Sequence, residues 1–522
     1  MSQANGQTEA GDAGLEGRPA MPVAHRLWRE ARERNGLGDR DLVELADRWG
    51  IPEGRLRTVA NFYPRFSEPD AAGEGTAFAC EGFFCGLAGG GRATAGDRAF
   101  SCPGMCDRAP VRWHPKRGFA AGTAELSEPA WDPEVELATP TVFRLARTPA
   151  FFTASAGESV AGDLYSPAFP GLRGETLLEE IGRLGPRDRR NPAVTLAERW
   201  RRAAETAADQ RFVIAHAGPG DPGSQANRQL MVHEAARLLR GMECCGRAIG
   251  ATEGVIHVGS ENPATTAAVE EAVNRATAAG FLGTSFDVTV VPGFGSYVGG
   301  EETALLNAVE GRRGEARVFP PEPEISGLFG RPVALAEAET FVLLAALGET
   351  PVVSPATRLA AVFGDGFARP GLAEIDGDTS VRAVLEAAGV ADSAWGLLFG
   401  GPRGTLLLPD EWDLLLDPAE WVSGDIRPGN WSFYALTADH EPRDVARRLL
   451  DYAAAENCGK CDPCRLGTLA ARDLVKSGRE PRRFGDILTA MEMTSLCDFG
   501  RQIPGPVRKL ARAFGEKIFA RA

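Results

Sequence analysis

The segment ENCGKCDPCRLGT, residues 456–468, constrains the fold of this chain more than any other. It holds Cys458, Cys461 and Cys464 with two residues between successive cysteines, and a fourth, Cys497, follows in TSLCDFG. Three thiolates on one short loop and a fourth from a distant segment are the ligands that a cubane 4Fe–4S cluster needs. The chain must therefore fold back so that the fourth cysteine reaches the loop. A zinc site and a redox-active dithiol are the alternatives that this spacing leaves open.

A second group of four cysteines lies nearer the N-terminus, in FACEGFFCG and FSCPGMCDRAPV. Cys80 pairs with Cys85 and Cys102 with Cys106, and each pair can hold one iron of a 2Fe–2S cluster. Short apolar runs before Cys80 and Cys102 predict strands that end at the ligands. Zinc is the main alternative here. Two disulfides are the weaker one, because ten cysteines in 522 residues are too few for a disulfide-stabilised scaffold.

The sequences around both cysteine groups resemble electron-input subunits of respiratory complex I. CGKCDPCRLGT with the following SLCDFGRQIPGPVRKLARAFGEKI is similar to the C-terminal cluster domain of the flavoprotein subunit. IPEGRLRTVANFYPRF, residues 51–66, resembles the helical entry to the thioredoxin-like 2Fe–2S subunit. GSYVGGEETALLNAVEGRR resembles the flavoprotein signature YICGEETALINSLEGRR. Such a fusion resembles the beta (diaphorase) subunit of soluble NAD-dependent formate dehydrogenases and bidirectional hydrogenases.

Apolar periodicity and the resemblance together predict an α/β multidomain protein. The long run NRQLMVHEAARLLRGMECCGRAI predicts one helix, in which Cys244 and Cys245 are packing residues and a vicinal redox pair is the alternative. The expected parts are a disordered tail (1–20), a helical entry with a thioredoxin-like 2Fe–2S domain (21–125), a linker (126–175), a Rossmann-like α/β domain with a degenerate FMN site (176–345), a ubiquitin-like β-grasp domain (346–432) and a helical bundle with the 4Fe–4S cluster (433–522).

The resemblance implies a site for FMN and NAD, and one of its sequence elements is kept. The cofactor-binding residues carried over from that element, YVGGEET, are Tyr297, Gly299, Gly300, Glu301 and Glu302. A structural explanation is also open for this element, in which the glycines shape a turn and Glu302 caps the helix that follows.

Three other elements of the family's flavin site differ in this chain. An anionic flavin phosphate needs open backbone N–H groups, which glycines supply best. The family's glycine-rich GRGGAGFPTGxKW corresponds here to DRRNPAVTLAERW, 188–200, in which Arg190 and Asn191 carry side chains where the family has glycines. The family's NADExEPG corresponds to HAGPGDPG, 216–223. Its pair of asparagines corresponds to Ala336 and Glu337. These changes predict a degraded site that holds no FMN and carries out no NAD chemistry of its own.

The first functional hypothesis is an iron–sulfur electron-transfer subunit of a cytosolic multi-subunit oxidoreductase, with a formate dehydrogenase as the favoured type. It would relay single electrons between a Mo- or W-containing catalytic subunit, or a hydrogenase-type one, and an acceptor such as a small iron–sulfur subunit or a ferredoxin. The second hypothesis is an FMN-dependent NADH dehydrogenase (diaphorase) subunit that reduces NAD. The third, a scaffold without redox function, is disfavoured by eight cysteines in ligand-like spacings.

Charge and hydropathy restrict the location and the partners. A formal net charge of −14 disfavours nucleic acid and anionic membranes as partners. No apolar run reaches the 18 residues of a membrane span. The polar start MSQANGQTEAGDAGLEGRP lacks the apolar region of a signal peptide, so we expect a cytoplasmic protein.

Overall fold

The structure is a computed structural model of the 522-residue chain. It describes residues 23–34, 36–63, 66, 78–89, 98–100, 102–114, 118–121, 137–152, 165–189, 194–216, 221–259, 262–295, 301–349, 352–418, 421 and 426–519. The tail expected at 1–20 lies outside these residues. None of the helices described is long and apolar enough to cross a membrane.

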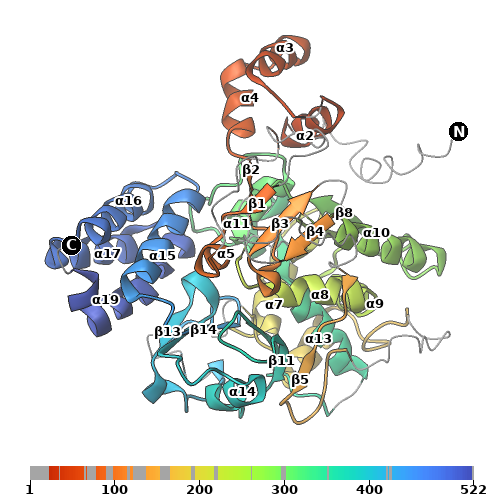
Figure 1. The fold of residues 1–522 in the computed structure, drawn as a ribbon. Helices are drawn as coiled ribbons and strands as arrows, with labels where there is room; N and C mark the ends of the chain where they lie inside the picture. The colour runs from red at the N-terminus through yellow and green to blue at the C-terminus, as the bar shows by residue number, and fades with distance from the viewer. Residues whose placement is uncertain are drawn as a thin grey trace, which may run out of the picture.

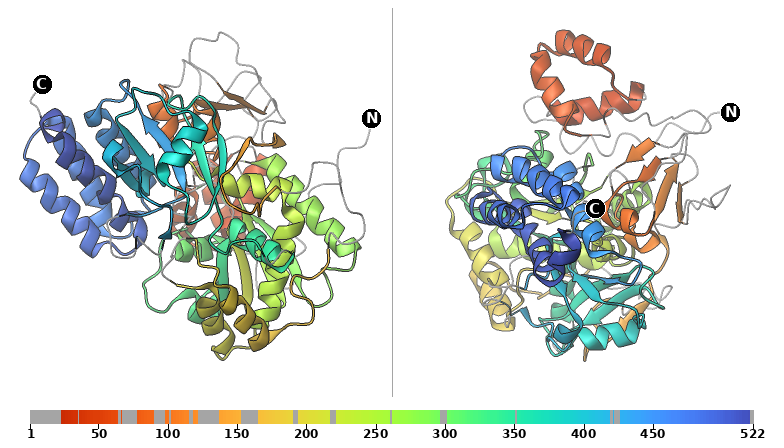
Figure 2. Two further views of the ribbon diagram at one scale, coloured as in Figure 1. Left: turned by 90° about the horizontal axis from the view of Figure 1, so that it is seen from below. Right: turned by 60° about the vertical axis from the view of Figure 1, so that its left-hand side comes forward.

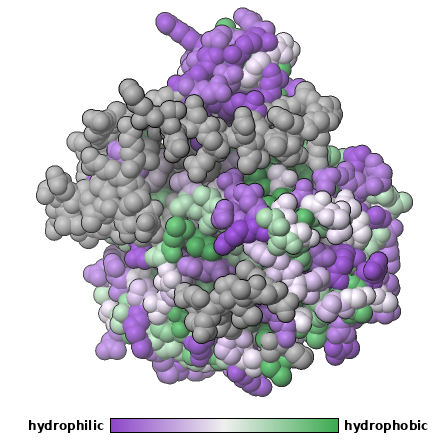
Figure 3. Space-filling view, turned by 90° about the vertical axis from the view of Figure 1, so that its right-hand side faces the viewer, coloured by the Kyte–Doolittle hydropathy of each residue, from purple (hydrophilic) through white to green (hydrophobic). Residues whose placement is uncertain are grey.

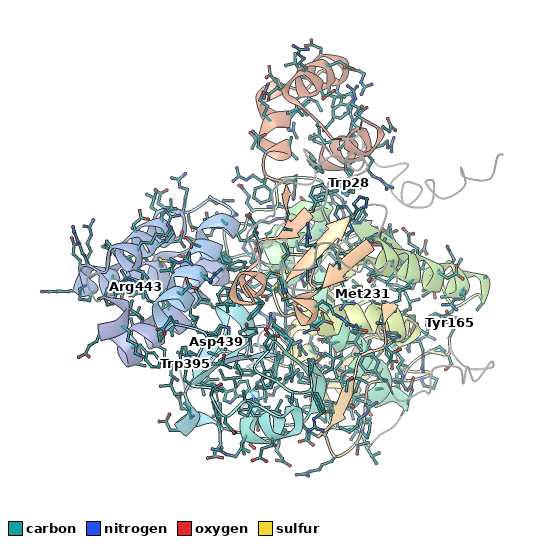
Figure 4. All side chains as sticks on the ribbon, in the orientation of Figure 1. Trp28, Tyr165, Met231, Trp395, Asp439 and Arg443 are labelled. Atoms are coloured by element: carbon teal, nitrogen blue, oxygen red, sulfur yellow. The ribbon has the colours of Figure 1, made fainter. Side chains whose placement is uncertain are left out.

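Helices α2 (Val23–Arg34), α3 (Asp39–Trp49) and α4 (Glu53–Ala60) form a unit that projects from the rest of the molecule (Figures 1 and 2). The face of this unit that Figure 3 shows is mostly hydrophilic, because most of its apolar residues pack inward. Phe294, from the main body, inserts into this interior, with its ring 5.2 Å from that of Tyr63 and 5.9 Å from that of Trp28, which Figure 4 labels at the junction. The predicted helical entry is confirmed.

The N-terminal cysteines lie on a small sheet. Within the described residues its strand order is β2-β1-β3-β4, with β1 and β2 parallel and the other pairs antiparallel. The strands are β1 (Phe78–Cys80), β2 (Arg98–Phe100), β3 (Val111–His114) and β4 (Gly118–Ala121), with α5 (Phe83–Leu87) and the 3-10 helix η2 (Cys106–Arg108) in the connections. The two strands predicted before Cys80 and Cys102 are confirmed. The thioredoxin-like assignment stays a prediction.

The central domain has a parallel sheet, which in the described part of the chain has the order β8-β7-β6-β9. Strands β6, β7 and β9 are almost entirely buried, as parallel strands between helices are, and the edge strand β8 is partly exposed. The elements are α6 (Gly174–Leu184), α7 (Leu196–Glu205), β6 (Phe212–His216), α8 (Gln225–His233), α9 (Ala235–Ile249), β7 (Glu253–Val258), α10 (Pro263–Ala278), β8 (Asp287–Pro292), α11 (Glu302–Val309), α12 (Pro323–Ser326), η5 (Leu328–Gly330), β9 (Val333–Glu337) and α13 (Ala338–Glu349). The expected α/β organisation is confirmed.

The single long helix expected over Asn227–Ile249 is wrong. The chain breaks at Glu234, whose backbone has φ −125° and ψ 23°, so α8 and α9 are separate helices. The Glu234 carboxylate accepts a hydrogen bond from the Phe152 amide at 2.6 Å. Cys244 and Cys245 are fully buried free thiols in α9, in agreement with the predicted packing role, and this burial raises the pKa of Cys244 to about 12.

A third sheet covers the lower part of Figure 1, and in the described residues its order is β13-β12-β14-β10-β11-β5. Its elements are β5 (Val142–Arg144), β10 (Arg358–Phe363), β11 (Gly371–Ile375), α14 (Val381–Ala388), β12 (Gly396–Phe399), η6 (Gly401–Arg403), β13 (Thr405–Leu407), η7 (Pro409–Glu411) and β14 (Ser432–Leu436). Strand β5 comes from the expected linker 126–175, so that segment is partly a sheet strand. The β-grasp assignment stays a prediction.

The C-terminal part is helical, as expected, and packs beside this third sheet (blue in Figure 1). Trp395, labelled in Figure 4, lies at the junction with its ring 4.8 Å from that of Phe514. The helices are α15 (Pro442–Glu456), α16 (Asp462–Ser477), α17 (Pro481–Thr494), α18 (Asp498–Gln502) and α19 (Pro504–Ile518).

Candidate functional site

The four N-terminal cysteines lie together in the interior. Strands β1 and β2 are parallel and in register, with Cys80 opposite Phe100, so Cys80 and Cys102 both follow the same edge of the sheet. A Cβ atom on Gly82 would lie 3.2 Å from Cys80 Sγ and 3.6 Å from Cys102 Sγ. The Sγ atoms of Cys102 and Cys106 are 3.6 Å apart. The structure therefore brings these cysteines together, as their spacing predicted. The absence of a side chain at Gly82 leaves room for the sulfur atoms of Cys80 and Cys102.

The central domain closes one side of this N-terminal set. The Gly223 amide donates to Cys106 Sγ at 3.2 Å, and Asn262 Nδ2 donates to the Pro103 carbonyl at 2.8 Å. Amide donors to sulfur are typical of iron–sulfur ligands, because they stabilise thiolate charge. In the free thiols, the hydrogen bond with Cys102 and then burial raise the pKa of Cys106, so metal binding must remove protons from this set.

The C-terminal cysteines are brought together by the return of the chain through α18. Cys458 lies on the turn between α15 and α16, Cys461 is the N-cap of α16 and Cys464 lies in its first turn, and Cys497 immediately precedes α18. A Cβ atom on Gly500, in α18, would lie 2.9 Å from Cys464 Cβ, so the two segments touch. The fold-back predicted from the spacing is confirmed.

Local structure explains how three of these thiols lie close together at the start of α16. The Asn457 side chain donates to the Ala454 carbonyl at 2.8 Å at the end of α15 and accepts the Gly459 amide at 3.0 Å. Gly459 has φ +76°, a left-handed conformation that glycine adopts without strain. Cys461 is the N-cap of α16, where the helix dipole favours a thiolate. A hydrogen bond from Cys464 lowers the pKa of Cys461 to about 5.

Both sets offer four cysteine sulfurs, which is the donor chemistry of iron–sulfur clusters. In the part of the chain that the structure describes, no three His, Cys, Asp or Glu side chains surround one point as the ligands of a single metal ion do, so the assignment of the clusters to these cysteines stays a prediction.

The expected flavin edge lies at the carboxyl ends of the parallel strands, where ligands bind in such sheets. His216 ends β6 and Glu337 ends β9. The rings of His216 and His257 stack there with centroids 6.0 Å apart, and burial lowers the pKa of His257 to about 4. Tyr297, Gly299 and Gly300 lie outside the described residues, as do Arg190 and Asn191.

Glu301 and Glu302 have different partners from those expected. Glu301, and not Glu302, caps α11, accepting from the Ala304 amide at 2.8 Å. Glu302 receives both terminal nitrogens of Arg199 at 3.1 Å. Burial, with a further contribution from Glu301, raises the pKa of Cys497 to about 12. The kept element of the flavin signature therefore borders the C-terminal cysteine set.

Two buried arginines at this edge are neutralised by the chain itself. Arg189 is 4% exposed and forms ion pairs with Glu337, at 3.1 Å, and with Glu339. Arg199 is 7% exposed. Besides Glu302 it pairs with two further carboxylates, those of Asp188 at 2.7 Å and Glu324 at 2.5 Å.

Two of these ion-paired residues stand at positions of the family's flavin motifs. Arg189 stands at the arginine of GRGGAGFPTGxKW, and Glu339 at the glutamate of VET, so their ion pair joins two motif positions. Glu337 stands where that family has the second asparagine, and it accepts from Asn227 Nδ2 at 3.2 Å. At this ion pair the chain therefore differs from the family in having the extra carboxylate of Glu337. Arg189 itself matches the family's motif.

Several contacting residues were missed by sequence reasoning. Gly223 and Asn262 touch the N-terminal cysteine loops, and Arg313 Nη2 donates to the Cys458 carbonyl at 2.5 Å. The only available signal was that Gly223 ends HAGPGDPG and that Arg313 follows the kept signature in EGRRG. Neither position indicated which cysteine it would meet.

Two parts of the chain match known domain families. Residues 193–343 match the Nuo51 FMN-binding domain, and residues 444–521 match the NADH-ubiquinone oxidoreductase-F iron-sulfur binding region. The first match covers the parallel sheet and α11, and the second covers all four C-terminal cysteines. The chain therefore contains an FMN-domain-like region and a 4Fe–4S binding region.

Whole-protein relatives belong to hydrogenases and complex I. The chain is 28% identical over 372 residues to NADP-reducing hydrogenase subunit HndC of Solidesulfovibrio fructosivorans, covering 66% of this chain and 75% of that one. It is 26% identical to the NAD-reducing hydrogenase HoxS subunit alpha of Cupriavidus necator (66% and 60% covered). It is also 27% identical to the mitochondrial NADH-ubiquinone oxidoreductase 51 kDa subunit of Neurospora crassa (60% and 69% covered).

The fold as a whole also has a solved counterpart. A chain in the crystal structure of the NAD+-reducing [NiFe]-hydrogenase in the H2-reduced state superimposes with a TM-score of 0.79 at 25% identity. The match covers 96% of this chain and 94% of that one, so it includes the N-terminal cysteine domain. These relatives favour the second functional hypothesis, the NADH dehydrogenase subunit, over the formate dehydrogenase relay.

Proposed function

We propose that this chain is the diaphorase-type electron-input subunit of a multi-subunit oxidoreductase, exchanging electrons between NAD(P)H and iron–sulfur clusters through FMN. The observation that carries the proposal is the position of α11. This helix belongs to the FMN-domain-like region, and Arg313, just beyond its end, donates a hydrogen bond to the Cys458 carbonyl. A flavin at that edge would adjoin the 4Fe–4S ligands.

The residues that would hold FMN at this edge include Glu301, Glu302 and Arg199. A flavin held there would supply the conversion between the two-electron hydride of NADH and the single electrons that iron–sulfur clusters carry. Glu302 and Arg199 hold each other in a bidentate pair, and Glu301 fixes the start of α11, so all three side chains are ordered before any ligand arrives.

A specific observation favours a second candidate, a flavin-free iron–sulfur relay. Arg189 is paired with two carboxylates and Arg199 with three, so neither buried cation carries an uncompensated charge. A flavin phosphate is an anion, and burying an anion requires a cation or open N–H groups to compensate it. In this candidate electrons would enter and leave through the clusters alone.

The partner we propose is a hydrogenase-type or complex I-type catalytic subunit, in place of the Mo- or W-containing formate dehydrogenase subunit expected from the sequence. HndC, HoxS subunit alpha and the 51 kDa protein are subunits of such enzymes by name, and no relative reported above is named as a formate dehydrogenase. A cytoplasmic location is part of the same proposal.

The 2Fe–2S cluster on the N-terminal cysteines is likewise proposed. It is supported by the proximity of Cys80, Cys102 and Cys106 and by the amide donor to Cys106 Sγ. The chemical reason is that four buried thiols with an N–H donor suit a small iron–sulfur cluster.

Flavin content decides between the two candidates. The complex is denatured, and released FMN is measured by fluorescence against protein and iron. About one FMN per chain with NADH- or NADPH-dependent dye reduction supports the diaphorase. Iron without flavin, and no reduction of dye by either nucleotide, supports the relay and rejects the first candidate.

A further inference from the structure

The segment EGRRGE, residues 310–315, lies between the N-terminal helical unit and the C-terminal cysteine loop. The Ala24 amide donates to the Gly311 carbonyl at 2.9 Å, and the Tyr63 hydroxyl donates to the Arg312 carbonyl at 2.7 Å. These bonds fix the backbone of the segment to α2 and to the residues that follow α4. The backbone immediately before Arg313 is therefore fixed in place, and this fixes the point from which its side chain extends.

Arg313 contacts both neighbours at once. Its guanidinium carbon lies 4.8 Å from the ring centroid of Phe62, and its Nη2 donates to the Cys458 carbonyl at 2.5 Å. A Cβ atom on Gly459 would lie 3.3 Å from the same Nη2. Glycine at 459 therefore lets the guanidinium approach the loop, in addition to permitting the left-handed backbone.

Positive side chains outnumber negative ones in the ion-pair cluster beside the Cys458 loop. Lys460 Nζ lies 3.3 Å from a Glu315 carboxylate oxygen, and Arg313 Nε lies 3.5 Å from the other. Two cations thus share one carboxylate beside a group of thiolate ligands. The Arg313 side chain is 33% exposed, so water and salt screen part of its charge.

We propose that Arg313 is a positioning residue for the C-terminal cluster, holding the Cys458 loop and raising the cluster's reduction potential. Reduction adds one negative charge to the cluster, and a cation beside its ligand loop stabilises the reduced form. The carbonyl bond fixes the backbone that carries Cys458 Sγ. The proposal depends on the 4Fe–4S cluster and not on FMN or NAD, so it is tested apart from the diaphorase activity.

The test is an EPR-monitored redox titration of the cubane signal in the full-length protein, with iron content measured alongside. Arg313→Met should shift the midpoint potential to more negative values. Glu315→Gln, which removes the shared carboxylate, should shift it to more positive values. Arg312→Met is the matched control, because that side chain is 70% exposed and pairs only with Glu310 in the contacts seen, and it should leave the potential unchanged.

Opposite shifts in the two variants support the proposal. Equal potentials in all four proteins overturn it, as do shifts of the same sign in Arg313→Met and Glu315→Gln. Where Arg313→Met loses its iron, Glu315→Gln decides alone: a positive shift supports the electrostatic role, and an unchanged midpoint rejects it.

Discussion

His257 illustrates how the position of one residue determines its chemistry. It is the fifth residue of β7, 6% exposed, against the ring of His216. Burial disfavours the imidazolium and lowers the pKa of His257 from 6.5 to about 4. The folded protein therefore holds this ring neutral over a pH range in which the unfolded chain protonates it.

The stability of the protein should consequently fall between pH 6.5 and pH 4 through His257. In this window the unfolded state binds the extra proton, so the free energy of unfolding decreases as the pH falls. From pH 7 to pH 5 the contribution is about 2 kcal/mol. Urea unfolding of His257→Gln at both pH values should show a pH dependence smaller by that amount. An identical dependence in the variant and the wild type would contradict the assignment.

At the scale of elements, one aromatic side chain attaches the projecting helical unit. Phe294 follows β8, yet its ring lies among Trp28, Tyr63 and Phe66. The other contacts between the unit and the body include two backbone carbonyl acceptors, those of Gly311 and Arg312. The apolar insertion therefore supplies much of the attachment.

Phe294→Ala should loosen α2, α3 and α4 while leaving the sheets intact. Removing a buried phenyl ring costs about 3–5 kcal/mol, and the loss falls on this junction. Amide hydrogen exchange in residues 23–60 should accelerate, with the parallel sheet unaffected. Phe329→Ala is the control, because that ring is 37% exposed and its loss should change little. Uniform acceleration over the whole chain would argue against a local role.

Sequence reasoning succeeded where the signal was local. The strands before Cys80 and Cys102, the helical entry and the return of Cys497 to the loop all follow from short patterns around the residues themselves. It failed at Glu234, because the apolar stripe continues through the break and no Gly or Pro marks it. The bond from Phe152, which is 82 residues earlier in the chain, is a tertiary contact that no local pattern contains.

The same limit applies to the site. Cysteine spacing predicted which thiols belong together, since each set has its own ligand pattern. It could not predict that Gly223 would donate to Cys106, or Arg313 to the Cys458 carbonyl, because these contacts depend on how separate domains pack. Nor could it predict the ion pairs of Arg189 and Arg199, because their carboxylate partners include Glu302, Glu337 and Glu339, which lie more than a hundred residues away in the sequence.

At the scale of the whole molecule, the two cysteine sets belong to one packed interior. Helix α5, which carries Cys85, packs on α15, which leads to Cys458. The rings of Phe83 and Tyr452 lie 6.3 Å apart across this contact, and a Cβ atom on Gly86 would lie 2.6 Å from Arg448 Nη1. The N-terminal and C-terminal parts are therefore joined directly.

Iron removal should accordingly destabilise both ends of the chain together. Metal binding is coupled to folding, and each set has its ligands in the shared interior. Calorimetry of protein treated with an iron chelator should show a lower Tm, and Cys461→Ser, which removes a C-terminal ligand, should also lower the transition that includes the N-terminal sheet. Cys245→Ser is the control for thiol loss away from both sets. An unchanged N-terminal transition in Cys461→Ser would show the ends to be independent.

The pairing of strand β5 suggests a place at which the protein could be produced as two separate polypeptides. By sequence it belongs to the N-terminal third, but it pairs in parallel with β11, and the Leu145 and Ala146 amides bond to the Glu374 carbonyl at 2.9 and 2.8 Å. Two polypeptides made by ending one after residue 152 and starting the other at residue 165 would each keep one side of this pairing. Co-expressed halves should therefore reassemble without a covalent connection, which makes this position suitable for split-protein reporters and for isotope labelling of one half.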